Sequence, residues 1–225
     1  MFKIFLTISV LQATLFASHI EWDIGRYGFK KISNSPEIYL AENFLSDAEC
    51  NHIIEKARPT LARSTVVDRN SSKGVVDKNR TSLGSSLSDA GDQVIQNIRN
   101  RVETITMIPY RNGEGLQVLN YGVGAEYKPH YDYFDAKTEG GKSHLKRGGQ
   151  RVATILLYLN TPEKGGETIF PNAPLHVRPV KGRALLFYDV TDQGKPDSKS
   201  LHGGAPVIAG EKWIANLWLR EGEFH

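Results

Sequence analysis

The chain has 225 residues, of which 40% are hydrophobic and 24% are charged, and its net charge is +3. These values are typical of one large globular domain or two small ones, and a positive charge this weak does not indicate a nucleic-acid-binding protein. The single cysteine, Cys50, excludes an intrachain disulfide, while the charge leaves room for an anionic small ligand.

The first segment, residues 1 to 18, reads MFKIFLTISVLQATLFAS. Its apolar run from Ile4 to Ala17 is shorter than the ~20 residues of a membrane-spanning helix and matches the apolar region of a secretory signal. We therefore expect a signal peptide that directs export to the secretory pathway, the periplasm or the ER lumen. A short membrane anchor, if the segment is not cleaved, and a helix of a cytoplasmic protein are the alternatives. Residues 19 to 225 are expected to form a single domain.

Two helices are predicted in the first half of this domain. Ser46, with Glu49 three residues later, has the capping-box pattern and predicts a helix that ends near Ala57. Apolar residues at helical spacing predict a second helix from about Asp89 to Thr106. Cys50 lies inside the first helix, where a packed structural thiol is favoured over a catalytic one.

From residue 115 onward, short apolar segments alternate with clusters of Gly, Pro, Asn and Asp, which is the pattern of strands and turns. Strands this regular favour a sandwich or jelly roll, so the expected fold class is α+β, mainly β. The predicted strands are GLQVLNYG (115–122), RVATILLYLN (151–160), ETIF (167–170), HVRPVKGRALLFYD (176–189) and KWIANLWLRE (212–221). Two polar, Gly-containing segments, 68–79 and 135–149, are long for plain connections and are candidates for mobile lid or binding loops.

The stretch HYDYF begins at His130 and reads as a strand, so His130 and Asp132 would project from the same face. An ordinary polar pair on a sheet is the alternative to a metal site. His202, in SLHGGAPVIAGEKW, precedes another strand that a jelly roll can bring beside the first. Two histidines and one carboxylate form the facial triad of non-haem Fe(II) enzymes that use oxygen.

Lys212 follows His202 by ten residues and begins an apolar strand. A lysine that points inward there needs an anionic partner, because an unpaired buried charge is costly. A dicarboxylate cosubstrate could supply that partner. A surface lysine at a strand edge is the alternative.

Four stretches together resemble the catalytic domain of prolyl 4-hydroxylases, which are Fe(II)- and 2-oxoglutarate-dependent dioxygenases. They are YKPHYDYF, GGQRVATILLYLN, GGETIFP and HGGAPVIAGEKW, and the resemblance runs from about Glu37 to the C-terminus, NRTSLG at 79–84 included. It implies a double-stranded β-helix, or jelly-roll, core with supporting N-terminal helices. It also implies hydroxylation of a peptidyl proline at C4, coupled to the conversion of 2-oxoglutarate and O2 to succinate and CO2, with ascorbate as reductant.

The resemblance assigns roles around the metal. His130, Asp132 and His202 would bind the iron, which 2-oxoglutarate would chelate through its 1-carboxylate and 2-keto oxygen. The far carboxylate would pair with Lys212, as a charge-assisted bond at the pocket floor. Cosubstrate contacts are also implied for Tyr121 and Thr168, although each could be a plain strand residue.

The resemblance also implies a substrate pocket. Tyr127 and Trp218 would grip the proline ring, and Arg151 would bind a peptide carbonyl. Arg80 and Ser82 would touch the peptide from the first lid loop. Trp218 could instead be simple core. The sequence departs from the family at residue 220, where an arginine stands in place of the expected histidine, which leaves contacts near Trp218 in doubt.

Other functions are compatible with parts of this pattern. A lysyl or free amino acid hydroxylase would keep the iron and the 2-oxoglutarate, although lysyl hydroxylases that resemble this family tend to carry arginine where Lys212 stands. Nucleic-acid repair is disfavoured by the weak charge and the absence of an evident base-stacking platform, so no nucleic-acid partner is expected. A non-catalytic jelly-roll binding module would be expected to lack part of the triad or Lys212.

Overall fold

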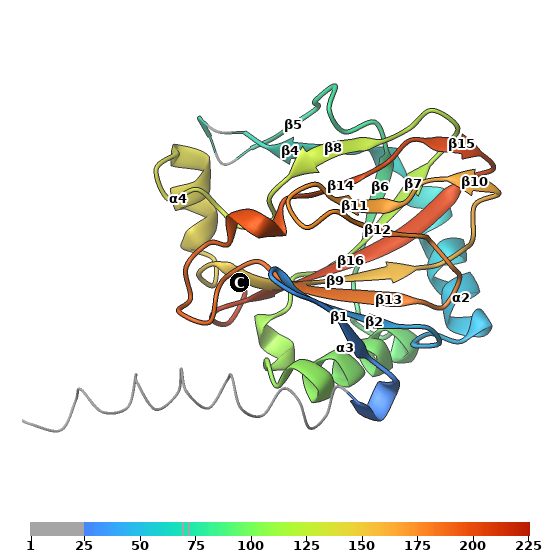
Figure 1. The fold of residues 1–225 in the computed structure, drawn as a ribbon, viewed down its shortest axis with the longest axis horizontal. Coiled ribbons are helices and arrows are strands. Elements are labelled where there is room, and N and C mark those ends of the chain that lie inside the picture. The colour runs from blue at the N-terminus through green and yellow to red at the C-terminus, as the bar shows by residue number, and fades with distance from the viewer. Residues whose placement is uncertain (1–24, 69, 72) are drawn as a thin grey trace, which may run out of the picture.

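The computed structural model describes residues 25–68, 70, 71 and 73–225 (Figure 1). The predicted signal segment, residues 1 to 18, lies outside this range. Among the described residues, no helix has the length and apolar character needed to cross a membrane.

Both predicted helices are confirmed, and the second begins later than expected. Helix α2 (Asp47–Ala57) has the reciprocal capping box between Ser46 and Glu49. Helix α3 (Gln93–Thr106) begins four residues after Asp89, because the Asp92 side chain accepts hydrogen bonds from the amides of the helix's first turn. A short helix, α4 (Glu139–Leu145), lies in the second predicted lid loop. The described part of the chain also forms short 3-10 helices at Gly25–Tyr27, Arg58–Thr60, Tyr110–Asn112 and Ser198–Ser200.

Two antiparallel sheets form the core, which confirms the mainly β class and the jelly roll (Figure 1). The larger sheet has the order β1 (Lys30–Asn34), β2 (Glu37–Ala41), β13 (Ala184–Tyr188), β9 (Arg151–Tyr158), β16 (Lys212–Arg220), β7 (Leu116–Tyr121), β6 (Leu83–Leu87) and β3 (Ala62–Arg63). The smaller sheet has the order β12 (Leu175–Val177), β11 (Thr168–Phe170), β14 (His202–Gly204) and β8 (Tyr127–His130). Among the described residues, two-stranded sheets are also formed by β10 (Lys164–Gly165) with β15 (Val207–Ala209), which are distant in the chain, and by β4 (Val66–Val67) with β5 (Gly74–Val75).

One predicted strand, 176–189, is wrong as a single element. It divides into β12 in the smaller sheet and β13 in the larger one. The break is a turn closed by the Arg183 amide on the Val180 carbonyl, with Gly182 at φ +83°. A β-branched or bulky residue would be strained at that φ, so the glycine permits the chain to change sheets.

Side chains of the larger sheet alternate between two apolar clusters. On β9, Ile155 and Leu157 pack outward with α2 and α3, whereas Leu156 and Tyr158 pack inward against the smaller sheet. Strands β7, β13 and β16 follow the same alternation. The helices therefore cover the outer face of the larger sheet, and the space between the two sheets is left for the site.

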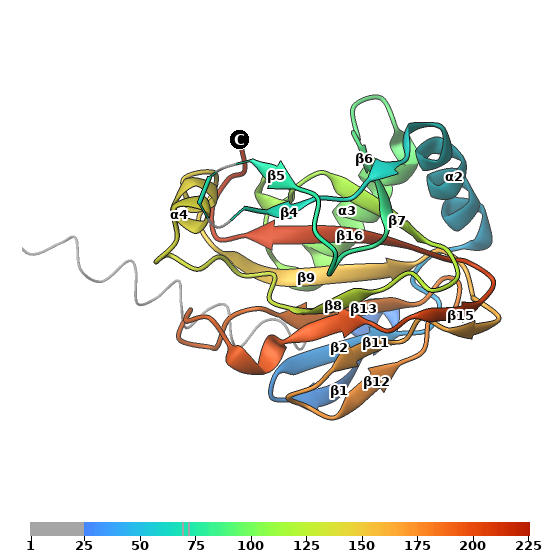
Figure 2. The same ribbon diagram turned by 90° about the horizontal axis from the view of Figure 1, so that it is seen from above.

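The two predicted lid segments lie together at one end of the molecule. Figures 1 and 2 both place α4 beside the β4–β5 hairpin. The contact is tight at Gly140, where a Cβ atom would collide with the backbone carbonyl of Asp68. The hairpin and α4 thus pack backbone against backbone, which only a glycine at residue 140 permits.

Candidate active site

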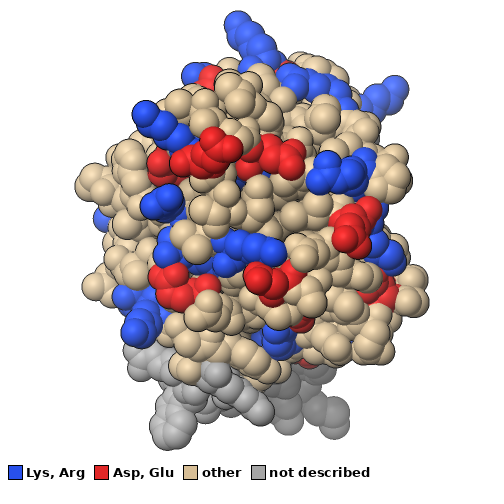
Figure 3. Space-filling model, turned by 90° about the vertical axis from the view of Figure 1, so that its right-hand side faces the viewer, with Lys and Arg blue, Asp and Glu red and all other residues tan. Residues whose placement is uncertain are grey.

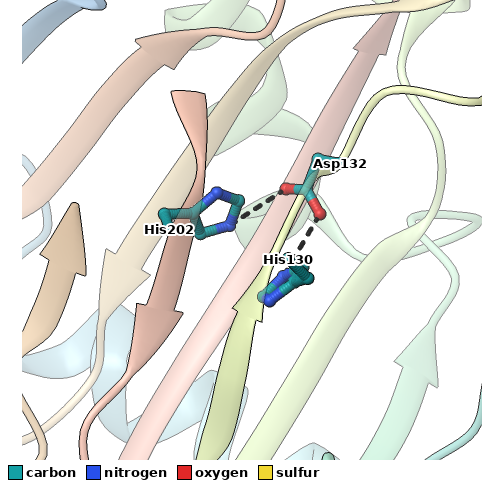
Figure 4. A group of neighbouring side chains, drawn as sticks. All are labelled: His130, Asp132 and His202. Atoms are coloured by element: carbon teal, nitrogen blue, oxygen red, sulfur yellow. Dashed lines mark ion pairs between the residues drawn. The ribbon is translucent and has the colours of Figure 1, made fainter. Parts of the chain in front are cut away.

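Pairing between β8 and β14 brings the two predicted histidines together. His130 ends β8, His202 begins β14, and the two residues stand directly opposite in the register. Asp132 comes from the bend after β8, so the expectation that HYDYF forms one strand is wrong beyond His130. The carboxylate still reaches both rings: its Oδ1 lies 3.6 Å from His130 Nε2 and its Oδ2 lies 3.6 Å from His202 Nε2 (Figure 4).

The three side chains have the chemistry of a metal site. Their potential ligand atoms all lie within 4.8 Å of one another. Nδ1 of His130 is 2.9 Å from the Lys128 carbonyl, and Nδ1 of His202 is 3.0 Å from the Ser200 carbonyl. A carbonyl can only accept, so each Nδ1 carries the hydrogen and each Nε2 keeps its lone pair for a metal.

Electrostatics favours the metal-binding protonation states. Burial lowers the pKa of His202 to about 4, so its ring is neutral at pH 7. Burial opposes ionisation of Asp132, but His202, His130 and Arg151 together hold its pKa well below the usual range. The site therefore offers two imidazole Nε2 atoms and one carboxylate, the donor set of a non-haem Fe(II) centre.

The Asp132 carboxylate is held from behind by the larger sheet. Its Oδ2 accepts a hydrogen bond from Trp218 Nε1 at 2.8 Å and lies 2.9 Å from Thr154 Oγ1. Trp218 and Thr154 are cross-strand neighbours on β16 and β9. Trp218, expected to line the proline pocket, therefore also orients the predicted metal ligand.

Lys212 is buried beside the triad and has no carboxylate partner. Its side chain is 1% exposed, and no Asp or Glu in the described part of the chain is within ion-pair distance of it. Burial lowers the pKa of Lys212 to about 8, and Glu167 acts on it only through space. Its Nζ would be 3.7 Å from a Cβ on Gly204, two residues along β14 from His202. A buried cation without a partner is costly, and it marks a place for an anionic ligand.

The other two predicted cosubstrate residues also lie near Lys212. Tyr121 is its direct cross-strand partner, with Lys212 Nζ 5.3 Å from the ring centroid. Thr168 stands opposite Gly204 and accepts a hydrogen bond from Tyr158 at 2.7 Å, which leaves its own hydroxyl hydrogen for a carboxylate. The geometry thus brings together all three residues that were expected to hold 2-oxoglutarate.

A cavity of about 1340 Å³ opens beside His130 and Asp132, and Lys212 is not among its lining residues. Its walls include His130 and Asp132, the β4–β5 hairpin, and the segment that leads into α4. The expected substrate residues that line it are Arg80, Tyr127, Arg151 and Trp218. This volume exceeds what a single amino acid side chain requires, so the cavity has room for a peptide.

The side chains in this cavity are largely fixed by the protein itself. The Tyr127 ring stacks on His130 with 3.6 Å between centroids, and Arg80 lies over the other face of Tyr127 at 4.8 Å. Arg80 donates to Thr65 and Gln117. These contacts present Tyr127 as a rigid aromatic wall beside the metal ligands.

For two of the expected substrate residues, Ser82 and Arg151, the structure differs from the expectation. Ser82 is fully buried and donates to Ser64, so its hydroxyl does not reach the cavity. Arg151 binds Glu114 through two N–H groups and approaches the Asp132 carbonyl with a third at 3.4 Å. Two of its five N–H groups therefore remain for a peptide carbonyl.

Glu114 lies in none of the motifs found in the sequence, and its position accounts for the buried arginine at residue 220. It lies between two guanidinium groups, with 2.7 Å to Nε of Arg151 and 2.7 Å to Nε of Arg220. Arg220 is 1% exposed and also donates to the Gly149 carbonyl. The arginine at the expected histidine position is therefore neutralised by a buried carboxylate and fixes the wall around Arg151.

Cys50 lies outside this site, in agreement with the prediction of a packed structural thiol. The thiol is fully buried, and burial raises its pKa to about 11. It lies among the core residues of α2 and is unreactive as a nucleophile.

Comparisons with known proteins agree with this geometry. Residues 116–220 match the model of the 2OG-Fe(II) oxygenase superfamily. Prolyl 4-hydroxylase 2 from Arabidopsis thaliana is 40% identical over 216 residues, which cover 87% of this chain and 71% of that protein.

Two solved structures share the fold. The viral collagen prolyl hydroxylase of Paramecium Bursaria Chlorella virus-1, solved as a 2OG complex, is 30% identical with a TM-score of 0.63, covering 81% of this chain and 95% of that one. The Trichoplax adhaerens prolyl hydroxylase, solved with a hypoxia inducible factor peptide fragment, has a TM-score of 0.61 at 18% identity and covers 96% and 93% of the two chains. At 18% identity, the second comparison supports the fold alone.

Proposed function

Because the chain belongs to the prolyl 4-hydroxylases of the 2OG-Fe(II) oxygenase superfamily, we propose that it hydroxylates C4 of a proline in a peptide or protein substrate. It is a 2-oxoglutarate-dependent dioxygenase that uses Fe(II) and 2-oxoglutarate. The observation that carries the assignment is Lys212, a buried cation that has no carboxylate partner among the described residues and lies beside Gly204, two strand positions from His202.

We assign the Fe(II) ligands to His130, Asp132 and His202. Fe(II) supplies the redox chemistry by which O2 oxidises 2-oxoglutarate to succinate and CO2 and hydroxylates the substrate. The protein's own part is to present two Nε2 lone pairs and one carboxylate oxygen, with hydrogen bonds that fix each ring and the carboxylate. Ascorbate belongs to this proposal as the external reductant.

We assign 2-oxoglutarate to the apolar space between the sheets. Lys212 would bind the distal carboxylate, with the Thr168 hydroxyl as a second donor and Tyr121 beside it. The apolar residues around this space exclude water, which strengthens the charge-assisted bond.

We assign the substrate to the large cavity beside His130 and Asp132. Tyr127 and Trp218 line this cavity, Tyr127 with the edge of its ring because His130 and Arg80 cover the faces, and Arg151 retains two N–H groups for a backbone carbonyl. An extended proline-containing segment, such as polyproline II, suits a cavity roofed by the β4–β5 hairpin and α4.

Two other substrate classes are less well supported. A free amino acid needs no peptide-sized cavity, so a shortened 68–79 segment would spare activity on one and abolish activity on a peptide. For nucleic acid, a continuous basic surface would be expected. The face over α2 and the β10–β15 pair carries acidic and basic side chains interspersed (Figure 3).

We place the enzyme in the periplasm or the ER lumen, on the strength of the apolar segment between Ile4 and Ala17. Membrane attachment follows if that segment is retained, and a cytoplasmic location follows if it does not direct export. The mass of the N-terminal peptide of protein purified from its own host distinguishes these outcomes.

The experiment that tests the function measures succinate formation by purified protein with Fe(II), ascorbate and 2-oxoglutarate, with and without proline-rich peptides. Peptide-stimulated succinate and the mass gain of one oxygen atom on proline are expected, and His130→Ala should abolish both. Turnover that no proline peptide stimulates would redirect the assignment to another substrate. If the wild-type protein binds no metal, the assignment as an Fe(II)-dependent enzyme is wrong.

A further inference from the structure

A second buried carboxyl group lies behind the metal-ligand candidates and has no role in the function proposed above. Asp189 follows β13 and is fully buried. Its Oδ2 is 2.8 Å from Thr154 Oγ1, whose other neighbour is Oδ2 of Asp132 at 2.9 Å. Its Oδ1 has no hydrogen-bond partner among the described residues.

The sheet register builds this arrangement. Thr154 lies on β9 between Trp218 of β16 and Phe187 of β13. Asp189 continues the inward-facing alternation of Leu185 and Phe187, and its backbone amide donates to the Val152 carbonyl. Thr154 is therefore fixed between the two carboxyl groups by three adjacent strands.

We propose that Asp189 is a positioning residue that directs the Thr154 hydroxyl hydrogen onto Oδ2 of Asp132. The hydroxyl has one hydrogen and two carboxyl neighbours, so it can satisfy both only by donating to one and accepting from the other. No cation of the described residues forms an ion pair with Asp189, and Arg151 acts on it only through space, so Asp189 is the carboxyl that can supply the second hydrogen. Burial and the nearby Asp132 raise the pKa of Asp189, which agrees with this direction.

The consequence lies at the metal site. With Thr154 and Trp218 both donating to Oδ2, the lone pairs of Asp132 Oδ1 stay available for a metal ion. Without Asp189, only Asp132 holds the Thr154 hydroxyl, so its direction is less well fixed and the two oxygens of Asp132 become less distinct. Asp189 thus selects which oxygen binds, through the hydroxyl and without touching the metal.

A purely structural role would have a different signature. A buried carboxyl with one unpartnered oxygen destabilises a fold, so replacing it by an apolar residue should leave stability equal or higher. The inference instead predicts that the replacement weakens metal binding while the protein stays folded. Stability and metal affinity therefore separate the two roles.

The test uses Mn(II) as a redox-inert probe of the Fe(II) site, with its dissociation constant measured from the EPR signal of the unbound ion. We expect Asp189→Ala and Thr154→Val to weaken Mn(II) binding roughly 10-fold or more, which is the scale of outer-shell effects on metal affinity. In Asp189→Asn the side-chain amide can still donate to Thr154, and Thr154→Ser keeps the hydroxyl. Each of these variants should therefore retain most of the wild-type affinity for Mn(II). Thr104→Val, an exposed hydroxyl on α3, is the matched control.

A second readout is the visible absorption of Co(II) bound in place of Fe(II), which reports how the carboxylate coordinates. Thr154→Val and Asp189→Ala should change that spectrum, and the two conservative variants should not. Folded variants with Mn(II) affinity and a Co(II) spectrum equal to wild type would overturn the inference. If Asp189→Ala does not fold, Asp189→Leu, which fills the same space without a hydrogen-bonding group, takes its place beside Asp189→Asn. The inference rests on the proposed metal site, and wild-type protein that binds no Mn(II) would show that the site assignment itself had failed.

Discussion

Lys212 shows how a single residue can carry a functional assignment. Its ammonium group is buried 5.3 Å from the centre of the Tyr121 ring and beside Gly204, and no carboxylate of the described residues neutralises it. A fold selected for stability alone would replace such a lysine with an apolar residue of similar volume. The ligand-free protein therefore holds a charge whose partner is supplied by the cosubstrate.

Replacing Lys212 with methionine should preserve the shape of the side chain and remove the charge. Loss of one partner of a buried ion pair costs about 3–5 kcal/mol, so the KM for 2-oxoglutarate should rise more than 100-fold. Mn(II) binding should be unchanged, because Lys212 does not touch the triad. Steady-state kinetics checks the first point, with Lys164→Met on exposed β10 as the control. A KM within threefold of wild type would remove Lys212 from the cosubstrate site.

Polar contacts between elements decide how the site is held. Glu114, in the connection before β7, joins the β9 and β16 ends through Arg151 and Arg220. Its two positive partners hold the pKa of Glu114 below its usual value despite burial. Arg151 also stacks on Trp218 at 3.8 Å, and Trp218 orients Asp132. The contacts of Glu114 at these strand ends therefore also help to hold Asp132 in place.

Glu114→Gln should destabilise the protein, because it leaves two guanidinium groups without their shared carboxylate. A loss of about 3 kcal/mol is expected, which lowers the Tm by roughly 6–12 °C for a chain of this length. Differential scanning calorimetry measures it. Glu103→Gln, on α3 away from the cavity, should change the Tm by less than about 2 °C. A matching small change in Glu114→Gln would mean that solvent, not Glu114, neutralises the two arginines.

Gly140 is the contact between the two elements that roof the cavity. Alanine there would press on the carbonyls of Asp68 and Ser71, so α4 and the β4–β5 hairpin must separate. We expect the KM for a proline peptide to rise roughly 10-fold, with little change in the KM for 2-oxoglutarate, because Lys212 does not line this cavity. Gly122→Ala, where a Cβ meets nothing within 4 Å, is the control. Equal peptide KM values in the two variants would show that the roof does not contribute to substrate binding.

At the scale of the whole molecule, the sequence predicts those features that local patterns encode. The two helices and the mainly β class were predictable, because the capping box, helical spacing and strand alternation encode them. The meeting of His130, Asp132 and His202 was expected chiefly from the resemblance to prolyl 4-hydroxylases, since Asp132 lies beyond the end of β8. The roles of Glu114, Thr154 and Asp189 were not, since they depend on cross-strand register between segments far apart in the chain. For the same reason, nothing local showed that Ser82 would be buried or that the 176–189 segment would divide between two sheets.

The free energy of unfolding should depend on pH in a way that reveals the charge state of Lys212. In the ligand-free fold its pKa is lowered to about 8, whereas in the unfolded chain it is 10.5. Between these values the unfolded chain holds a proton that the folded protein has released, so the contribution of Lys212 to the free energy of unfolding rises with pH. It is lost as the pH falls through about 8, and its full size is about 3 kcal/mol.

Urea denaturation between pH 7 and pH 10.5 measures this contribution as the difference between wild type and Lys212→Met, which cancels the titration of the tyrosines and other lysines. Wild type should be the less stable of the two at pH 7, and the gap should close as the pH rises. Saturating 2-oxoglutarate should reverse the order at pH 7, because the ligand binds the protonated lysine and stabilises only the wild type. A gap that does not depend on pH would mean that Lys212 keeps its proton throughout this range, paired with a group of the protein itself.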